Sequence, residues 1–286
     1  MDVSIIIPTY NRPQALRRCL QGIAALAYDG DRFEVIVVDD GSDRAQENLL
    51  TTLVDGPVRW LRQANAGPAA ARNAGAAVAN GRLLCFTDDD CSPHPDWLAH
   101  LWAQFEQMPA AALGGRTINQ LVDNPYAAAS QLLIDYLYAY YRAPDDTAPR
   151  FFTSNNLAVP ADLFRQTGGF DTTMPLAAGE DREFCERWRL AGRLLSFVPD
   201  ALVHHAHPLT LPRFWRQHFN YGRGAWQFRQ RVGAVALERW GFYGRLLSYP
   251  WHVDGVQKRP LLTLLLIISQ LANAAGYLRE QRRTTD

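Results

Sequence analysis

Short runs of apolar, β-branched residues alternate with helical patterns along the first part of the chain. Residues 3–7 and 34–38 read VSIII and EVIVV, and polar residues follow each run. A helical pattern that begins near Pro13 separates the two runs. Strand, helix and strand in this order predict the repeating unit of a parallel sheet.

The same alternation continues to about residue 115. It predicts, in order, a polar helix near 43–54, a strand at 58–61, an Ala-rich helix at about 67–79 and a strand at 82–87. Asn80-Gly81 supplies the stop signal of the Ala-rich helix. We therefore expect an α/β fold with a Rossmann-like, mostly parallel central sheet flanked by helices.

Beyond residue 115 the alternation lapses. A long helical stretch and a polar Pro/Asp loop occupy 116–150, and we expect them to form an insert over one face of the sheet. Mixed strand and helix patterns return at 151–205, and 210–232 has the pattern of a helix rich in aromatic residues and Arg. The pattern predicts a helical C-terminal extension.

An 18-residue, mostly apolar segment lies at 261–278. As a helix it spans about 27 Å, just short of a hydrocarbon core of roughly 30 Å. Ser269, Gln270 and Asn273 place a polar stripe on one side. This pattern favours a helix that lies on a membrane or packs against the rest of the chain over one that spans. A core or dimer helix is the alternative.

Composition sets the broad class. Of 286 residues, 48% are hydrophobic and 20% charged, which is typical of a globular protein and excludes wholesale disorder. Twenty-nine basic and 29 acidic residues give no net charge, which argues against nucleic acid as a partner. The two signs are segregated, however. Residues 1–200 carry 17 basic and 25 acidic residues, and the remainder carries 12 and 4.

The cysteines and the start of the chain bear on location. Cys19, Cys85, Cys91 and Cys185 show no CxxC spacing, so we expect reduced thiols in the cytosol. The chain begins directly with a strand pattern, without the features of a secretory signal. We expect a cytoplasmic protein, with the basic excess near 261–278 suited to the cytoplasmic face of an anionic inner or plasma membrane.

Polar residues follow three of the predicted strands, at 8–12, 39–42 and 88–90. Ligands of open parallel sheets bind at the carboxyl ends of the strands, so these residues are expected to meet at one site. They contain no GxGxxG pattern and no P-loop lysine, which argues against a dinucleotide site. The run Asp88-Asp89-Asp90 needs a cation nearby, and Mg²⁺ or Mn²⁺ with oxygen ligands would supply it. A solvated acidic turn before a helix near Pro95 is the alternative.

These motifs resemble the inverting family 2 glycosyltransferases of the GT-A fold. The matching segments are VSIIIPTYNR at 3–12, EVIVVDDGS at 34–42, NAGPAAARNAGAAVANG at 65–81, FTDDD at 86–90, TSNNLAVP at 153–160, GGFD at 168–171 and GEDREFCERWRLAG at 179–192. They cover about residues 1–207 in the family's order. The resemblance implies a GT-A catalytic domain at 1–209, with a nucleotide-binding half at 1–115 and an acceptor-binding half at 116–209. The helical extension is then 210–286.

The resemblance also implies roles for individual residues. Pro8, Tyr10 and Asp40 would hold the nucleotide base, with Asp39 supporting the turn. The full set of implied nucleotide or donor contacts is Pro8, Thr9, Tyr10, Arg12, Asp39, Asp40, Arg72, Asp88, Asp89 and Asn155. Asp90, with Asp88 and a late histidine, would coordinate the metal.

The reaction needs a general base, because the acceptor hydroxyl must lose a proton as it attacks the sugar. Glu180-Asp181 opens a predicted helix after Gly179, and the family pattern favours Asp181, with Glu180 in reserve. An acidic pair at a helix start can also serve only the helix dipole. For the metal, the pattern V-x-H selects His205 among His204, His205 and His207, although the three could equally form a polar loop.

The segment at 217–221 lacks the Arg-Trp pair of the QxxRW motif found in processive relatives, which favours transfer of a single sugar. Arg223 is a candidate for contact with the diphosphate, or a surface arginine.

We therefore predict a metal-dependent inverting enzyme that uses a nucleoside-diphosphate-sugar, with a UDP-sugar favoured. Its acceptor would be a hydroxyl of a glycan, a lipid-linked molecule or a small molecule, in the synthesis of cell-surface polysaccharide, glycolipid or another glycoconjugate. Two alternatives remain at this stage: a nucleotidyltransferase, and a catalytically silent protein that binds sugar nucleotides or acts as a membrane scaffold.

Overall fold

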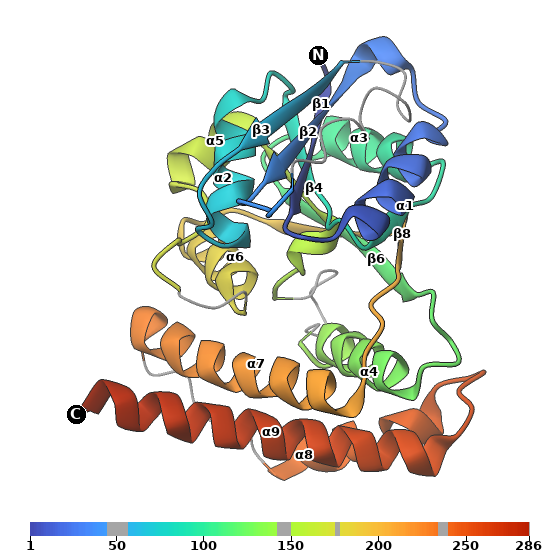
Figure 1. Cartoon of the computed structure of the whole chain (residues 1–286), viewed down its shortest axis with the longest axis vertical. Helices are drawn as coiled ribbons and strands as arrows, with labels where there is room; N and C mark the ends of the chain where they lie inside the picture. Colours follow the sequence, from blue (N-terminus) through green and yellow to red (C-terminus); the bar gives the residue numbers. More distant parts are fainter. Residues whose placement is uncertain (45–56, 142–149, 175–177, 234–239, 286) are drawn as a thin grey trace.

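A computed structural model describes residues 1–44, 57–141, 150–174, 178–233 and 240–285. A central sheet carries helices on both faces, and further helices form a layer below its lower end (Figure 1). The described strands are β1 (Val3–Thr9), β2 (Phe33–Asp39), β3 (Val58–Arg62), β4 (Leu83–Phe86), β5 (Cys91–Pro93), β6 (Ala112–Asn119), β7 (Leu157–Pro160) and β8 (Leu195–His205). The described α-helices are α1 (Pro13–Ala24), α2 (Pro68–Val78), α3 (Trp97–Gln107), α4 (Pro125–Tyr140), α5 (Ala161–Thr167), α6 (Glu180–Leu190), α7 (Leu211–Val232), α8 (Trp240–His252) and α9 (Arg259–Thr285).

The strands form one mixed sheet in the order β3-β2-β1-β4-β7-β6-β8-β5. The pairs β1-β2, β1-β4, β2-β3 and β6-β8 are parallel, whereas β7 runs antiparallel between β4 and β6. The short β5 is antiparallel to β8 at the edge. The parallel half of the sheet matches the strand runs read from the sequence, and the carboxyl ends of β1, β2 and β4 point to the same edge.

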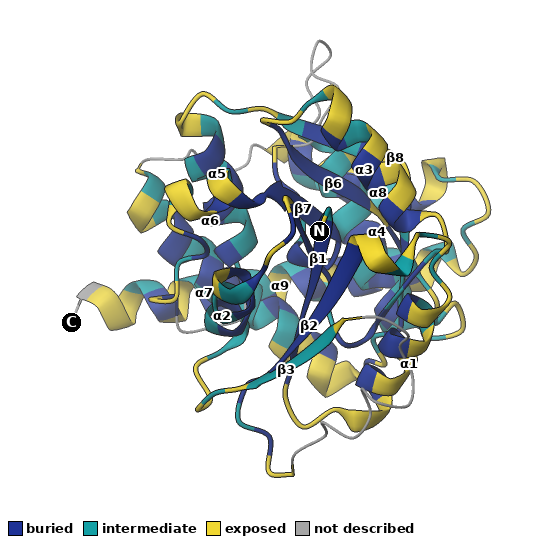
Figure 2. Ribbon diagram, turned by 90° about the horizontal axis from the view of Figure 1, so that it is seen from above, coloured by how far each residue is buried: buried dark blue, intermediate teal, exposed yellow. Residues whose placement is uncertain are grey.

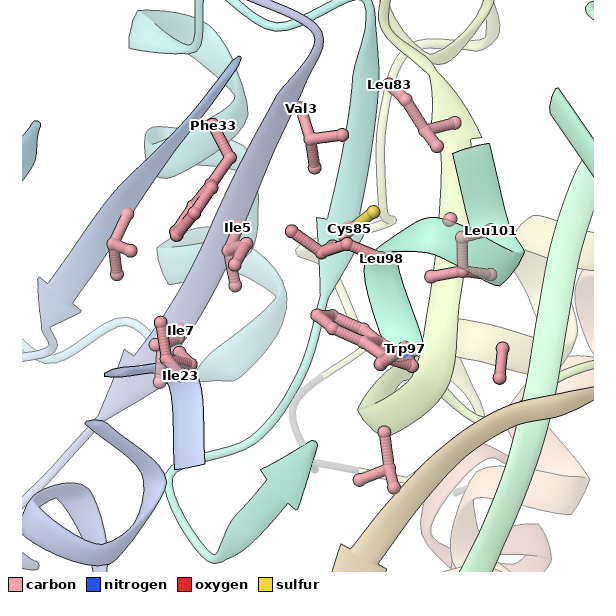
Figure 3. Packing of buried hydrophobic residues seen from close by; sticks show 14 of the residues in the cluster. Val3, Ile5, Ile7, Ile23, Phe33, Leu83, Cys85, Trp97, Leu98 and Leu101 are labelled. Carbon is pink, nitrogen blue, oxygen red and sulfur yellow. The ribbon is translucent and has the colours of Figure 1, made fainter. Parts of the chain in front are cut away.

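Both faces of the sheet are buried, which explains why its central strands read as continuous apolar runs. Because successive side chains of a strand point to opposite faces, Val3, Ile5 and Ile7 pack toward α1 and α3 (Figure 3). Ile6 and Phe86 belong to the opposite cluster, beneath α2, α5 and α6. Figure 2 shows these central strands as the most buried part of the protein.

One expectation needs correction, and another falls on residues outside the described part. The stretch expected to cover a sheet face is α4, but α4 packs on α7, α8 and α9 as well as on β6, so it belongs to the helical layer at the end of the sheet. The expected division at residues 115 and 116 falls inside β6, at a register shift. Most of the helix expected at 43–54 lies in 45–56, outside the described residues.

The helical layer is held together by the close approach of α7 and α9 (Figure 1). A Cβ atom on Gly276 would lie 1.9 Å from the carbonyl oxygen of Phe219, and one on Gly222 would lie 1.8 Å from that of Asn273. Glycine at these two positions therefore permits backbone contact between the helices. The buried carboxylate of Glu280 in α9 accepts hydrogen bonds from Arg223 and Gln227 in α7.

Candidate active site

A cavity of about 1460 Å³ lies between the carboxyl ends of the parallel strands and the helical layer. Its volume exceeds the roughly 300–1,000 Å³ of an ordinary small-molecule site, so it can hold more than one ligand. Most residues singled out from the sequence line it: Pro8, Thr9, Tyr10, Arg12, Asp40, Arg72, Asp88, Asp89, Asn155, Glu180, Asp181 and His205. Asp39 and Asp90 are buried just behind this lining.

The two aspartates after β2 have different tasks. Asp39 is fully buried, and its Oδ1 accepts the backbone N–H of Ser42 at 2.8 Å, so it supports the turn as expected and does not reach the cavity. The Asp40 carboxylate accepts the backbone N–H groups of Ala66 and Gly67 at 2.9 and 2.8 Å. Asp40 thereby fixes the loop that leads into α2 while it lines the cavity.

The three aspartates after β4 have different sets of partners, and Arg12 pairs with both Asp89 and Asp90. Asp88 pairs with Arg72 at 2.6 Å. Asp89 accepts a hydrogen bond from Thr9 Oγ1 at 2.8 Å and lies 3.2 Å from the Arg12 guanidinium. Burial raises the pKa of Asp89 to about 7 against the opposing charge of Arg12. The repulsion expected within the acidic run is thus offset by two arginines from other elements.

Asp90 contacts two histidines and accepts a hydrogen bond from Arg12 at 2.7 Å. Its carboxylate is 3.2 Å from His205 Nε2 and 3.0 Å from His207 Nδ1, and the three candidate ligand atoms lie within 4.8 Å of one another. Burial alone would raise the pKa of Asp90, but the hydrogen bonds to His205 and His207 hold it well below its usual value. Asp88, which was expected beside Asp90 at a metal, is directed to Arg72 instead.

The sequence pattern selected His205 and missed His207. His204 precedes His205 on β8, where successive side chains point to opposite faces, and it is absent from the group. His207 follows the strand end, where strand periodicity no longer predicts direction. The H-x-H spacing of His205 and His207 was the available signal.

The group Asp90, His205 and His207 fits a divalent cation. It offers one carboxylate oxygen and two imidazole nitrogens, a donor set typical of transition metals. His205 and His207 both line the cavity, so a cation held there would be accessible to a ligand inside it.

Arg72 joins the two sides of the site. This buried side chain on α2 donates hydrogen bonds to Asp88 at 2.6 Å and to Glu180 Oε1, on α6, at 3.2 Å. Burial and the neighbouring charge of Asp181 raise the pKa of Glu180 to about 7. Glu180, the second candidate for the general base, therefore forms an ion pair with Arg72.

Asp181 has a different environment on the same helix turn. Gly179 precedes it with φ of 100°, a conformation that favours glycine, and this turn starts α6 at the cavity wall. Asp181 Oδ1 accepts the backbone N–H of Arg182 at 2.8 Å, and no cationic side chain of the described residues forms an ion pair with it. Burial raises the pKa of Asp181. Asp181 lines the cavity, so its carboxylate is accessible to a ligand there.

Two other expectations have different outcomes. Asn155 lines the cavity, where its side-chain oxygen accepts a hydrogen bond from Thr153 Oγ1 at 2.7 Å. Arg223 pairs with Glu280 at 2.7 Å and is absent from the lining, so the structure does not support its contact with a diphosphate. Arg182 and Arg229, which the sequence motifs did not single out, line the cavity.

The chain matches known proteins in sequence. Residues 4–165 match the family model described as Glycosyl transferase family 2. Glycosyltransferase AglE of Haloferax volcanii is 28% identical over 263 residues, which cover 88% of this chain and 84% of that protein. The pre-mycofactocin glycosyltransferase of Mycobacterium tuberculosis is 33% identical over 231 residues, 78% of this chain, but the match covers only 47% of that protein.

Solved structures support the fold. A mannosyltransferase from Pyrobaculum calidifontis, PcManGT, superposes with a TM-score of 0.64 at 18% identity, over 99% of this chain and 79% of that one. S. aureus TarS 1-349 superposes with a TM-score of 0.59 at 16% identity, over 100% and 93%. The chain belongs to glycosyl transferase family 2 and is an inverting glycosyltransferase with a GT-A-like fold and a C-terminal helical extension.

Proposed function

We propose that this enzyme transfers one sugar from a nucleoside-diphosphate-sugar, with a UDP-sugar favoured, to an acceptor hydroxyl. The observation that carries the proposal is that one cavity is lined by the acidic strand ends, by His205 and His207 beside the buried Asp90, and by Asp181. The Asp181 carboxylate forms no ion pair with a cationic side chain of the described residues. The structural neighbours support it, because PcManGT was solved with GDP-Man and Mn²⁺ and TarS with UDP-GlcNAc. Pro8, Tyr10 and Asp40 would border the base.

Asp90, His205 and His207 would hold the metal, and Asp88 would lie on the phosphate side of the site. Mg²⁺ prefers oxygen ligands, so the two imidazoles favour Mn²⁺. When bound, a divalent cation offsets the negative charge that develops on the diphosphate. Arg12 and Arg72 supply further positive charge beside the aspartates.

In the proposed step, the acceptor oxygen forms a bond to the anomeric carbon as the bond from that carbon to the diphosphate breaks. The nucleoside diphosphate leaves with the electron pair, and Asp181 takes the proton of the hydroxyl. A raised pKa makes the ionised carboxylate a stronger base than an ordinary aspartate. One displacement from the opposite face of the sugar gives inversion.

The absent Arg-Trp pair at 217–221 supports transfer of one sugar, in cell-surface polysaccharide, glycolipid or other glycoconjugate synthesis. Membership of a glycosyltransferase family argues against both alternatives, the nucleotidyltransferase and the catalytically silent binding or scaffold protein. We place the enzyme in the cytoplasm, in peripheral contact with a membrane.

The observation behind the membrane contact is the orientation of α9. By length and composition this helix could cross a membrane, and a third of its most apolar window is buried. Its polar residues Gln270 and Asn273 face the cavity, whereas Leu264 and Leu271 are 52% and 58% exposed. A helix with its polar side inward and its apolar side outward suits the surface of a bilayer. The packing of α9 on α7 favours such contact over a span.

Calorimetric titration of the protein with UDP, GDP and dTDP, with and without Mn²⁺, tests the donor proposal. We expect UDP to bind most tightly and Mn²⁺ to strengthen its binding. If GDP bound most tightly, the donor would be a GDP-sugar and not a UDP-sugar. If the nucleotide bound equally tightly without any divalent cation, the result would contradict the metal site.

A further inference from the structure

One wall of the cavity is apolar and lies away from the polar strand ends. Residues of α4 and α8 form it: Leu133, Ile134, Leu137, Tyr140, Phe242 and Tyr243. The carboxylates and arginines expected at the donor and the reacting hydroxyl come instead from the loops after β1, β2 and β4 and from α2 and α6. The wall is therefore a second, chemically different part of the same cavity.

The wall is a packed surface. The rings of Tyr140 and Phe242 meet edge to face, with centroids 4.8 Å apart at 89°, and Tyr136 meets Phe242 at 5.1 Å. The Tyr136 hydroxyl donates a hydrogen bond to the carbonyl oxygen of Phe242 at 2.7 Å, which ties α4 to α8. Such packing holds the rings in place without a ligand.

Ile134 differs from its neighbours on α4. Leu133 and Leu137 pack into apolar clusters of the protein, but Ile134 belongs to none of the clusters formed by the described residues and lines the cavity with its side chain partly exposed. An apolar side chain left at a cavity surface is available to an apolar ligand.

The wall adjoins the proposed general base. Tyr138, on the same helix, accepts a hydrogen bond from the backbone N–H of Thr153 at 2.8 Å. Thr153 and Asp181 line the same cavity as the wall, so the wall and this carboxylate face one space. A molecule lying on the wall could thus present a hydroxyl to Asp181.

We propose that the acceptor is an amphiphile, a hydroxyl-bearing molecule with an acyl, prenyl or alkyl chain, and that its chain lies on the wall formed by α4 and α8. This rests on the proposed function, because the donor fills the polar part. The cavity volume allows both substrates. A purely polar saccharide would place hydroxyls against the apolar wall and gain nothing from it. The hydrocarbon chain of an amphiphile instead gains about fourfold in affinity for each methylene removed from water.

Octyl β-glucoside and methyl β-glucoside test the proposal, since they share a headgroup and differ in their chains. Binding of each, below micelle-forming concentrations, is measured by calorimetry with the nucleoside diphosphate and Mn²⁺ present. The variants are Ile134→Asn, on the wall, and Ala139→Asn, on an exposed part of the same helix. Their thermal unfolding shows that each remains folded.

We expect octyl glucoside to bind wild type and Ala139→Asn at least tenfold more tightly than methyl glucoside, and Ile134→Asn to lose most of this preference. Equal binding of both glucosides by wild type would overturn the proposal. A preference that survives in Ile134→Asn would also overturn it, because the chain would then bind elsewhere, for example on the outer side of α9. Nucleotide binding is measured first, by titrating each protein with the nucleoside diphosphate and Mn²⁺ alone, so its loss would count against the proposed function separately.

Discussion

At the scale of single residues, the chemistry depends on how neighbouring carboxylates are partnered. Glu180 and Asp181 are adjacent in sequence, yet only Glu180 forms an ion pair with Arg72, whereas the Asp181 carboxylate accepts the backbone N–H of Arg182. Asp88, Asp89 and Asp90 likewise have three different environments. Identity and position along the chain do not determine these roles, which depend on the partner that the fold brings to each side chain.

The metal group gives a prediction at this scale. We expect His207→Ala to weaken Mn²⁺-dependent nucleotide binding at least tenfold, because loss even of groups that only support metal ligands costs about 10–100-fold in affinity. Calorimetric titration with UDP and Mn²⁺ measures it. His204→Ala is the matched control, since His204 lies outside the group. If the two variants bound UDP equally tightly with Mn²⁺, the result would contradict a role for His207 in holding the metal.

The site could be predicted from the sequence where local rules apply. Polar residues that end parallel strands meet at one edge of a sheet, so Thr9, Asp40 and Asp88 were expected to lie together, and they line one cavity. His207 was missed because it follows β8, beyond the strand's periodicity. The pairing of Arg72 with Glu180 spans 108 positions, and no local pattern specifies such a contact.

At the scale of elements, the strands were predictable because sheets buried on both faces require long apolar runs. The helices of the extension were predictable as helices, but their neighbours were not. Ser269, Gln270 and Asn273 were recognised as a polar stripe, yet only the packing of α9 on α7 shows that the stripe faces inward. The same packing pairs Arg223 with Glu280, whereas the sequence had suggested a contact with the diphosphate.

Glu280 gives a prediction about pH. Burial alone would raise its pKa, but hydrogen bonds from Arg283, Arg223 and Gln227 lower it to about 2. Because the pKa is lowered on folding, the ionised carboxylate stabilises the fold fully at pH values above its ordinary pKa of 4.5. This contribution is lost as the pH falls toward 2.

We therefore expect Glu280→Gln to lower the free energy of unfolding by about 2 kcal/mol at neutral pH, the value of a hydrogen bond to a charged group. The difference from wild type should vanish near pH 2. Denaturant unfolding across this pH range measures it. Glu186→Gln, at a partly exposed ion pair with Arg189, is the control and should have little effect. A difference that persists undiminished at pH 2 would contradict this account of Glu280.

At the scale of the whole molecule, the mixed sheet and its flanking helices lie on one side of the cavity and the helical layer lies on the other (Figure 1). The opposed charges of the two parts of the chain follow this division. Residues 1–200, which are acidic, contain the carboxylates of the site and α4 of the layer. The Arg-rich remainder forms α7, α8 and α9, and the outer side of α9 carries exposed leucines.

This arrangement predicts membrane binding through α9. Wild type should sediment with vesicles that contain anionic lipid, and the double variant Leu264→Ser/Leu271→Ser should bind them at least tenfold less, because two leucines leave the apolar surface. Leu190→Ser/Leu194→Ser is the matched control, with leucines that are 72% and 62% exposed on another part of the protein. Equal binding by both variants would refute the contact. A dimer that dissociates in the α9 variant would assign this surface to a second copy.

The central claim is that Asp181 takes the acceptor proton in sugar transfer from a nucleotide sugar. Its most direct test is release of nucleoside diphosphate by Asp181→Asn, measured with the tightest-binding nucleotide sugar, Mn²⁺ and water as acceptor. We predict turnover about 10²–10⁴-fold below wild type, with donor affinity unchanged and with Asp162→Asn, at an exposed carboxylate, fully active. Full turnover by Asp181→Asn would contradict the account.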